Sequence, residues 1–100
     1  MIVAFVQIPL PAPLSEAAAS RLFEGTAPFY RDLPGLCRKH YILSHDGRVA
    51  GGLYFWRDRA VAEHSYDEQR HRRVRELYGA EPQIAWFSNL VMVDNEGIRR

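Results

Sequence analysis

The chain has little cysteine, little net charge and no long apolar segment. Cys37 is its only cysteine, which excludes an intramolecular disulfide and favours a reducing compartment. The formal net charge is +1, so no strong electrostatic field attracts nucleic acid or an anionic membrane. The apolar run 1–10 lacks a basic lead-in and is interrupted by prolines, unlike a membrane span or a secretory signal. We therefore expect a cytoplasmic protein without nucleic-acid or membrane partners.

Motifs that identify large enzyme classes are also absent. The sequence contains no phosphate-binding glycine loop, no paired-cysteine zinc pattern, no nucleophile elbow and no two-histidine metalloprotease signature. The histidines are scattered and leave a metal site without a third ligand, so no metal site is predicted. With 100 residues, of which 47% are hydrophobic, the chain is expected to form one domain over residues 1–100.

The segment from Leu36 to Trp56 predicts a β-hairpin. Asp46-Gly47 is the dipeptide that most strongly indicates a two-residue turn, because primed turns need positive φ. With these two residues as the loop, the register follows by counting outward from the turn. The opposed pairs are then His45–Arg48, Ile42–Gly51, Tyr41–Gly52, His40–Leu53, Lys39–Tyr54, Arg38–Phe55 and Cys37–Trp56.

Neither face of this hairpin is polar. One face would carry Ile42, Val49, Leu53 and Phe55, and the other Cys37, Tyr41, Leu43, Ala50, Tyr54 and Trp56. A sheet with one wet face alternates apolar and polar residues, so both faces of this one should be covered. Cys37 would then be a small buried thiol. Gly51-Gly52 indicates a close approach of a ligand, a ring or a backbone, and packing of Tyr41 over Gly52 is the preferred interpretation.

The first part of the chain predicts a strand and a helix. Residues 2–8 are β-branched and apolar, which is typical of a central strand buried on both faces. Ser15 is a suitable N-cap for the helix that follows. Pro28 lacks an amide hydrogen and crowds the preceding turn, so we expect a kink or break near Thr26.

The last part predicts two helical pieces and a strand. Asp58 caps a helix across 59–66, and Asp67 caps a second piece across 68–78 that ends at Gly79. A last strand is expected over 83–93, and residues 94–100 should form a frayed tail.

The order of these elements predicts an α+β fold, a ferredoxin-like βαββαβ protomer with a four-stranded antiparallel sheet. Its helices cover one face of the sheet and leave the second apolar face bare. A large exposed apolar patch usually indicates an interface, and a two-fold homodimer is its commonest cover. We therefore expect two protomers to close face to face into a dimeric α/β barrel.

Two histidines are candidate general bases. His40 lies in a predicted strand and His64 on a predicted helix, and the two could approach one another across a gap between sheet and helix. The pKa of an imidazole suits proton transfer near neutral pH. For each, a hydrogen-bonded structural histidine is the alternative. His45 at the turn and His71 on a basic helix face are expected to be solvated.

Lys39 is flanked by aromatic residues across the strand pair. Its preferred interpretation is an edge residue whose ammonium reaches solvent. The alternative is a pocket-lining lysine whose pKa is lowered by burial, and which serves as an acid or an anion anchor. Seven aromatic side chains could wall a cavity for a flat hydrophobic ligand, or could be core. They are Tyr30, Tyr41, Tyr54, Trp56, Tyr66, Trp86 and Phe87.

A run of arginines follows on the last predicted helix. Acidic residues on the same helix offset it, so we interpret it as a solvated face rather than an anion-binding surface. Its members, expected to point mostly outward, are Arg70, Arg72, Arg73 and Arg75.

Pro34-Gly35-Leu36, Lys39 and the run 50–56, Ala-Gly-Gly-Leu-Tyr-Phe-Trp, resemble the small YdhR-like mono-oxygenases of the dimeric α/β-barrel superfamily. The similarity extends loosely over nearly the whole chain. It implies a ferredoxin-like protomer, an obligate homodimer and a ligand cavity between sheet and helices. Relatives in that superfamily oxidise electron-rich aromatic or quinol-like compounds with dioxygen and no bound cofactor. Others degrade haem, isomerise lactones or bind ligands as dimers.

The resemblance also implies a mechanism. A base deprotonates a phenol or enol, the anion gives an electron to dioxygen, and the radical pair recombines in a dry pocket. His64 or His40 would be the base and Lys39 or Tyr54 the donor to the anion. Trp56 and Trp86 would be walls. Two alternatives stay open: a non-catalytic dimer that binds a small hydrophobic molecule, and a haem-degrading relative with an iron ligand such as His64.

Overall fold

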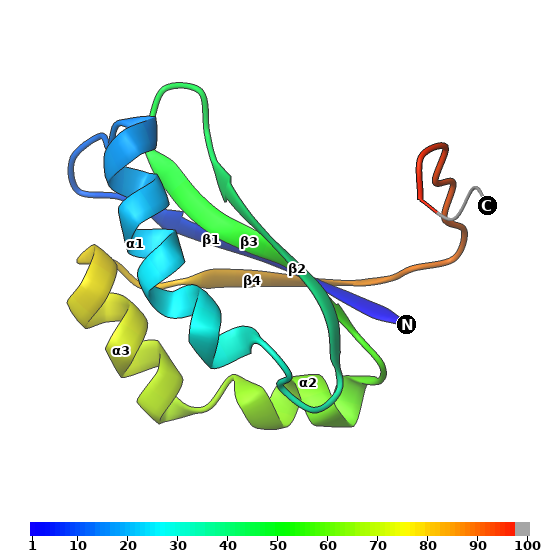
Figure 1. Ribbon diagram of the computed structural model, residues 1–100. Coiled ribbons are helices and arrows are strands. Elements are labelled where there is room, and N and C mark those ends of the chain that lie inside the picture. The colour runs from blue at the N-terminus through cyan, green and yellow to red at the C-terminus, as the bar shows by residue number, and fades with distance from the viewer. Residues whose placement is uncertain (98–100) are drawn as a thin grey trace.

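The computed structural model describes residues 1–97. Its elements follow in the order β1 (Ile2–Pro9), α1 (Glu16–Tyr30), β2 (Leu36–Leu43), β3 (Val49–Trp56), α2 (Arg59–Ser65), α3 (Glu68–Tyr78) and β4 (Gln83–Ser88). The strands form one antiparallel sheet in the order β2-β3-β1-β4, which is the predicted ferredoxin-like arrangement. The three helices lie on one face of the sheet, and the chain after β4 extends away from it on the other side (Figure 1).

The hairpin of β2 and β3 has the predicted register but a different turn. Lys39 opposes Tyr54, as expected. The loop is longer than two residues, because the Ser44 amide donates to the Val49 carbonyl at 2.8 Å. Within the turn dipeptide only Gly47 has positive φ, at 74°. Asp46 instead accepts hydrogen bonds through its carboxylate from the Ser44 hydroxyl and the Arg48 amide. The loop is longer by His45 on one side and Arg48 on the other, so the register of the strands is unchanged.

Cys37 forms a bulge rather than a cross-strand pair. Leu36 takes the position opposite Trp56, and the register shifts between Leu36 and Arg38. A bulge adds one residue to one strand and interrupts the alternation of faces. The prediction of a buried thiol is therefore wrong, and Cys37 is exposed.

Helix α1 continues through Pro28 to Tyr30, so the predicted break near Thr26 is wrong. Ser15 caps the helix as predicted and accepts a hydrogen bond from the Ala18 amide at 3.1 Å. Pro28 withholds one amide donor, but on an exposed stretch of helix water can replace it. The last turn is held by packing, because the Tyr30 ring lies 5.8 Å from that of Tyr54 in the sheet.

Helices α2 and α3 begin at the predicted residues; α3 also ends as predicted, and α2 ends at Ser65, one residue early. Asp58 accepts from the Val61 amide and Asp67 from the Arg70 amide, both at 2.9 Å. Gly79 ends α3 in the left-handed conformation, with φ of 78°. No helix in the described part of the chain is both long and apolar enough to cross a membrane.

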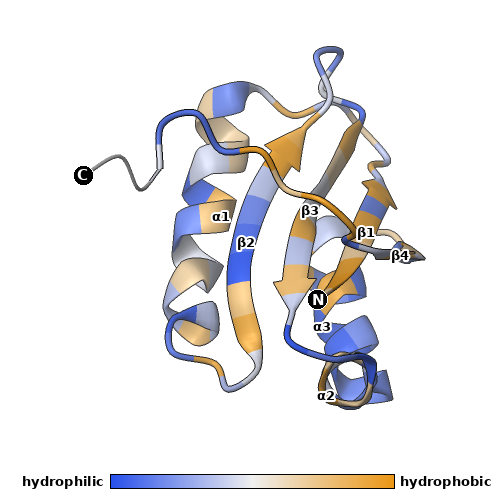
Figure 2. Ribbon diagram, turned by 90° about the vertical axis from the view of Figure 1, so that its right-hand side faces the viewer, coloured by the Kyte–Doolittle hydropathy of each residue, from blue (hydrophilic) through white to orange (hydrophobic). Residues whose placement is uncertain are grey.

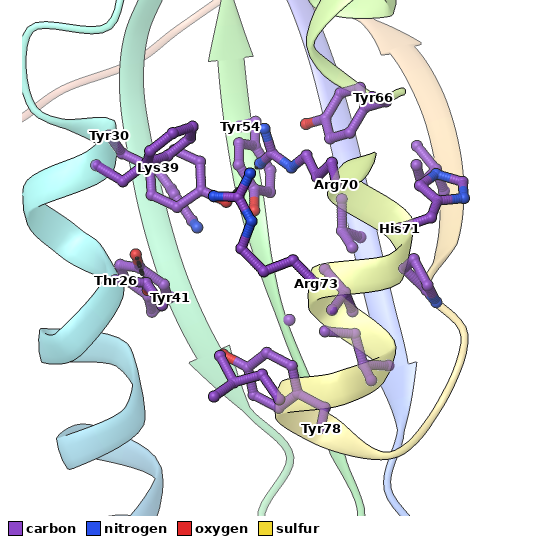
Figure 3. Close-up of a pocket in the computed structure, with 18 of the residues that line it drawn as sticks. Thr26, Tyr30, Lys39, Tyr41, Tyr54, Tyr66, Arg70, His71, Arg73 and Tyr78 are labelled. Atoms are coloured by element: carbon purple, nitrogen blue, oxygen red, sulfur yellow. Dashed lines mark hydrogen bonds between the residues drawn. The ribbon is translucent and has the colours of Figure 1, made fainter. Parts of the chain in front are cut away.

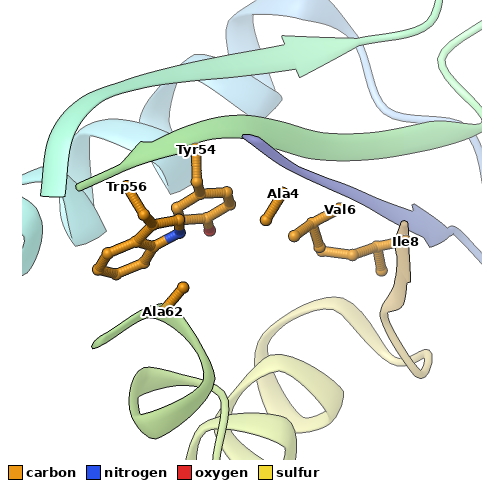
Figure 4. Close-up of a cluster of buried hydrophobic side chains, with 6 residues drawn as sticks. All are labelled: Ala4, Val6, Ile8, Tyr54, Trp56 and Ala62. Carbon is orange, nitrogen blue, oxygen red and sulfur yellow. The ribbon is translucent and has the colours of Figure 1, made fainter. Parts of the chain in front are cut away.

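The two faces of the sheet differ in how they are covered. The face beneath the helices holds the core (Figure 4), whose members are Ala4, Val6, Ile8, Tyr54, Trp56 and Ala62. On the opposite face Val3, Phe5 and Phe55 are only partly buried, and Phe87 is 54% exposed. β1 is central, as predicted, but within one protomer only one of its faces is closed. In Figure 2, β1 is coloured mostly as hydrophobic.

β4 ends at Ser88, five residues before the predicted end at position 93. The Asn89 amide still donates to the Met1 carbonyl at 3.0 Å, but β1 offers no further residue to pair with. The apolar segment that follows is 63–87% exposed; its members are Leu90, Val91, Met92 and Val93. Of the predicted frayed tail, residues 94–97 lie outside any helix or strand, and 98–100 lie outside the described residues.

Candidate active site

A cavity of about 250 Å³ lies between the covered face of the sheet and helices α1 and α3 (Figure 3). Its position settles which face of the hairpin lines a pocket: the face that carries Lys39 and Tyr54. Four of the aromatic residues predicted to contact a ligand line it, namely Tyr30, Tyr41, Tyr54 and Tyr66.

Lys39 points from β2 into this cavity. Its Nζ atom lies 3.4 Å from the ring centroid of Tyr30, 3.8 Å from that of Tyr41 and 4.4 Å from that of Tyr54. Gly52, on the neighbouring strand, makes room for it. A Cβ atom there would lie 3.3 Å from Lys39 Cε and 3.2 Å from Tyr54 Cε1. The close neighbours of Gly52 are thus Lys39 and Tyr54, and not Tyr41 as predicted, while Gly51 lies against the Val6 backbone of β1.

The charge state of Lys39 follows from this setting. Burial lowers its pKa to about 6, and the nearby Arg70 guanidinium acts in the same direction. The three ring faces favour the ammonium and oppose this shift, which is set by burial and like-charge repulsion. At neutral pH Lys39 is therefore mostly a neutral amine. The preferred interpretation of Lys39 as a solvent-reaching edge residue is wrong, and its pocket-lining alternative describes its position.

Arg70 is the second basic residue of the site, and its position differs most from the one predicted from the sequence. It is 7% exposed rather than pointing outward. Its Nη2 atom donates to the Tyr30 hydroxyl at 2.6 Å, and its guanidinium carbon lies 4.7 Å from the Tyr66 ring centroid. The sequence contains a signal for this, because Arg70 stands one helical turn before the apolar residue Val74 and therefore lies on the same face of α3.

Four tyrosine hydroxyls of the cavity, those of Tyr41, Tyr54, Tyr66 and Tyr78, have a raised pKa and stay protonated at neutral pH. Burial raises the pKa of Tyr54 well above its usual value, and also that of Tyr66 despite the hydrogen bond that Tyr66 accepts from Trp56. Burial raises the pKa of Tyr78 to about 12. The Tyr41 hydroxyl lies 2.6 Å from Thr26 Oγ1, which fixes its ring against α1. These phenols can donate hydrogen bonds to a ligand, and they cannot serve as its bases.

Two further residues of α3 line the cavity. His71, expected to be solvated, is half-buried, and its Nε2 atom is buried without a hydrogen-bond partner among the described residues. Arg73 reaches from α3 towards α1, with its guanidinium carbon 4.9 Å from the Phe29 ring centroid. Both could have been found from helical spacing, because His71 stands three residues before Val74 and Arg73 four before Leu77.

The structure does not bring His40 and His64 together. His40 is exposed on the helix-free face of the sheet, with its ring 6.0 Å from that of Phe55. His64 is exposed near the end of α2. Neither lines the cavity. The expectation that they share a gap between sheet and helix is wrong, since Lys39 and its sequence neighbour His40 point to opposite faces of β2.

The tryptophans do not line the cavity either. Trp56 is buried in the core, and its Nε1–H donates to the Tyr66 hydroxyl at 3.2 Å. The Trp86 ring lies 5.6 Å from that of Tyr66, in an edge-to-face arrangement. Phe87 is on the opposite face of the sheet. The two tryptophans thus support a wall of the cavity, Tyr66, instead of forming one.

The cavity combines apolar walls with basic side chains. Lys39, Arg70 and Arg73 line it, and no aspartate or glutamate does among the described residues. In residues 1–97 no three His, Cys, Asp or Glu side chains are grouped so as to hold a metal ion. A neutral amine beside a guanidinium can accept a proton from an acidic hydroxyl while the guanidinium and the phenols stabilise the resulting anion. The geometry therefore suits an aromatic ligand with an acidic oxygen.

Solved structures show the same fold. A monooxygenase from the gene ActVA-Orf6 of Streptomyces coelicolor, in complex with nanaomycin D, superposes with a TM-score of 0.68 at 20% identity, covering 95% of this chain and 92% of that one. SnoaB, a cofactor-independent oxygenase from Streptomyces nogalater, gives 0.65 at 17% identity, covering 92% and 96%. Rv0793 from Mycobacterium tuberculosis gives 0.66 at 18% identity, covering 94% and 100%.

Comparisons by sequence find no counterpart. No protein-family model matches the chain. No curated protein matches it either. Membership of the YdhR-like branch therefore stays a prediction, and the solved structures show that the chain shares their fold.

Proposed function

We propose that this protein is a cofactor-independent monooxygenase that oxidises a small electron-rich phenol or quinol with dioxygen. The observation that carries the proposal is Lys39, a neutral amine inside a tyrosine-lined cavity and next to a buried arginine. A group that titrates near neutral pH is suited to general-base catalysis, and such pairs of shifted groups concentrate at active sites. The fold shared with two oxygenases supports it.

The residues take definite roles in this reaction. Lys39 Nζ accepts the proton of the substrate hydroxyl, and the Arg70 guanidinium with the neighbouring phenols stabilises the resulting anion. The electron-rich anion transfers one electron to dioxygen, and the radical pair recombines. Recombination forms a C–O bond and gives a hydroperoxide. Its O–O bond then breaks as it loses water, which leaves one oxygen atom in the substrate as a carbonyl, with all four electrons supplied by the substrate. The apolar walls keep competing water away from the anion.

We further propose that the working form is a homodimer. The helix-free face presents partly buried apolar side chains, and the exposed apolar segment 90–93 continues beyond the last strand on the same side. A second copy of the chain would cover both at once, as a two-fold interface does. Native mass spectrometry should give a dimer, and Phe55→Glu, which puts a charge on this face, should shift it to a monomer. A wild-type monomer would refute the dimer.

The sharpest test of the chemistry is oxygen uptake with a panel of hydroquinones and naphthols. Turnover with at least one of them, without added metal, flavin or haem, is expected. A non-catalytic binder would instead quench the fluorescence of the tryptophans that pack on Tyr66, saturably and without consuming oxygen. Haem is left out of the proposal because His64, its candidate ligand, does not line the cavity. A Soret band after haem addition would reverse that choice.

A further inference from the structure

The chain contains a single lysine, and that lysine is the one inside the cavity. Lys39 is the only lysine among 13 lysine and arginine residues. We propose that Lys39 captures aromatic aldehydes or ketones as a reversible imine, so that the cavity is also a covalent carbonyl-binding site. This activity needs neither dioxygen nor turnover and does not depend on the proposed oxygenase reaction.

The geometry leaves the nitrogen of Lys39 available for such a reaction. Nζ is held among three tyrosine rings, and in residues 1–97 no carboxylate forms a salt bridge with it. The rings restrict the side chain without consuming the nitrogen lone pair. Burial and the charge of Arg70 lower its pKa to about 6, so the lone pair is free at neutral pH. Desolvation and a neighbouring cation are the two features that activate lysines for Schiff-base chemistry.

The reaction balances without a further reagent. The lone pair of Nζ forms a bond to the carbonyl carbon as the C=O π bond opens, giving a carbinolamine. The C–O bond then breaks, and the oxygen leaves as water with the two hydrogens that the amine has lost. A C=N bond remains, and nothing is oxidised or reduced. Arg70 favours the neutral imine over the iminium cation, for the same reason that it lowers the pKa of Lys39.

The walls define the class of carbonyl compound. Tyr30, Tyr41 and Tyr54 surround Nζ with ring faces, which suits a flat aromatic group on the carbonyl carbon. Arg70 and Arg73 line the same cavity, and no carboxylate does among the described residues. An aromatic aldehyde or ketone that also bears a phenolic hydroxyl or a carboxylate should therefore bind better than one without an acidic oxygen.

Reductive trapping tests the proposal. The protein is incubated without oxygen with 4-hydroxybenzaldehyde at pH 7, and samples are treated at intervals with borohydride, which reduces neutral imines as well as iminium ions. The secondary amines formed are located by intact mass and peptide mapping. The variant Arg72→Lys supplies an internal comparator, because position 72 is exposed on α3 and outside the cavity lining. An ordinary lysine at pH 7 has a neutral fraction below about 0.1%. Lys39 should react at least about ten-fold faster than the lysine introduced at position 72.

Two further measurements, one with a variant and one with a second aldehyde, complete the test. Lys39→Met should lose the fast modification while the chain's α-amine reacts as before. Benzaldehyde, which lacks the hydroxyl, should modify Lys39 more slowly than 4-hydroxybenzaldehyde. Reaction of Lys39 at or below the rate at position 72 would overturn the carbonyl site, and equal rates for the two aldehydes would overturn the assigned ligand class. Neither result would bear on oxygen uptake, which is measured without a carbonyl probe.

Discussion

Lys39 and His40 are consecutive residues of β2 and end in opposite environments. The Lys39 amine lies among tyrosine rings beneath the helices, where burial and Arg70 lower its pKa to about 6. The His40 imidazole is exposed on the helix-free face. As a residue type, histidine is the more usual general base near neutral pH. The packing reverses this order, because only the lysine faces a cavity that could hold a substrate.

The largest expected effect compares these two neighbours directly. If Lys39 is the base, Lys39→Met, which keeps an unbranched chain of similar length, should lower kcat by about 100-fold or more. His40→Ala should leave kcat within about two-fold, because its ring is on the other face of the sheet. Steady-state oxygen uptake with the best phenol of the panel measures both. If the histidine variant loses turnover and the lysine variant keeps it, the base is His40 on the helix-free face and not Lys39.

The next effect is on stability, and its sign follows from proton binding. Between pH 6 and 10.5 the unfolded chain holds a proton on Lys39 that the folded chain has lost. The free energy of unfolding should then rise with pH across this window, by at most about 1.4 kcal/mol per pH unit relative to Lys39→Met. Other titrating groups are common to both proteins and cancel in the difference. Urea unfolding of both proteins at several pH values measures this difference in free energy of unfolding. A difference that does not change with pH would show that the pKa of Lys39 is that of an ordinary lysine.

Arg70 and Arg72 offer a second comparison, between a buried and an exposed arginine of one helix. Arg70→Met removes the charge that helps to lower the pKa of Lys39, so that pKa should rise by about one unit. Arg72→Met should not change it. Because the chain has one lysine, protein labelled with ¹³C-lysine gives a single Cε signal, and its NMR titration reports the value directly. If the pKa of Lys39 is the same in the two variants, the charge of Arg70 does not contribute to lowering it.

The sequence determined the parts of this structure that depend on local geometry. The order of elements, the helix caps at Ser15, Asp58 and Asp67, and the stop at Gly79 all follow from residue type and spacing. The hairpin register was also correct, even though the turn is not the one predicted. A loop that is longer by one residue on each side leaves the pairing unchanged.

The parts that could not be predicted depend on what packs above a residue. The bulge at Cys37 and the early end of β4 are set by neighbouring strands, which spacing along the chain does not reveal. Arg70 was grouped with its charged neighbours because arginine is seldom buried, although its helical spacing already placed it inward. Lys39 was interpreted as an edge residue for the same reason. Both predictions relied on the usual exposure of lysine and arginine side chains. The two residues that depart from this usual exposure are the candidates for function.

The smallest expected effect tests how tightly the covered face is packed around Lys39. In Gly52→Ala the new methyl would lie 3.0 Å from the His40 carbonyl oxygen and 3.3 Å from Lys39 Cε, so the lysine stem must shift. Overpacking of this kind should lower the free energy of unfolding by about 1 kcal/mol. Gly25→Ala, with nothing within 4 Å of its new methyl, should instead raise it by about 0.5 kcal/mol, as expected for a glycine within a helix. Urea unfolding gives both values, and the Cε signal of Lys39 should move only in the Gly52 variant. An unmoved signal would mean that the stem has free space, and the rings around Nζ would then not fix the amine where a base is needed.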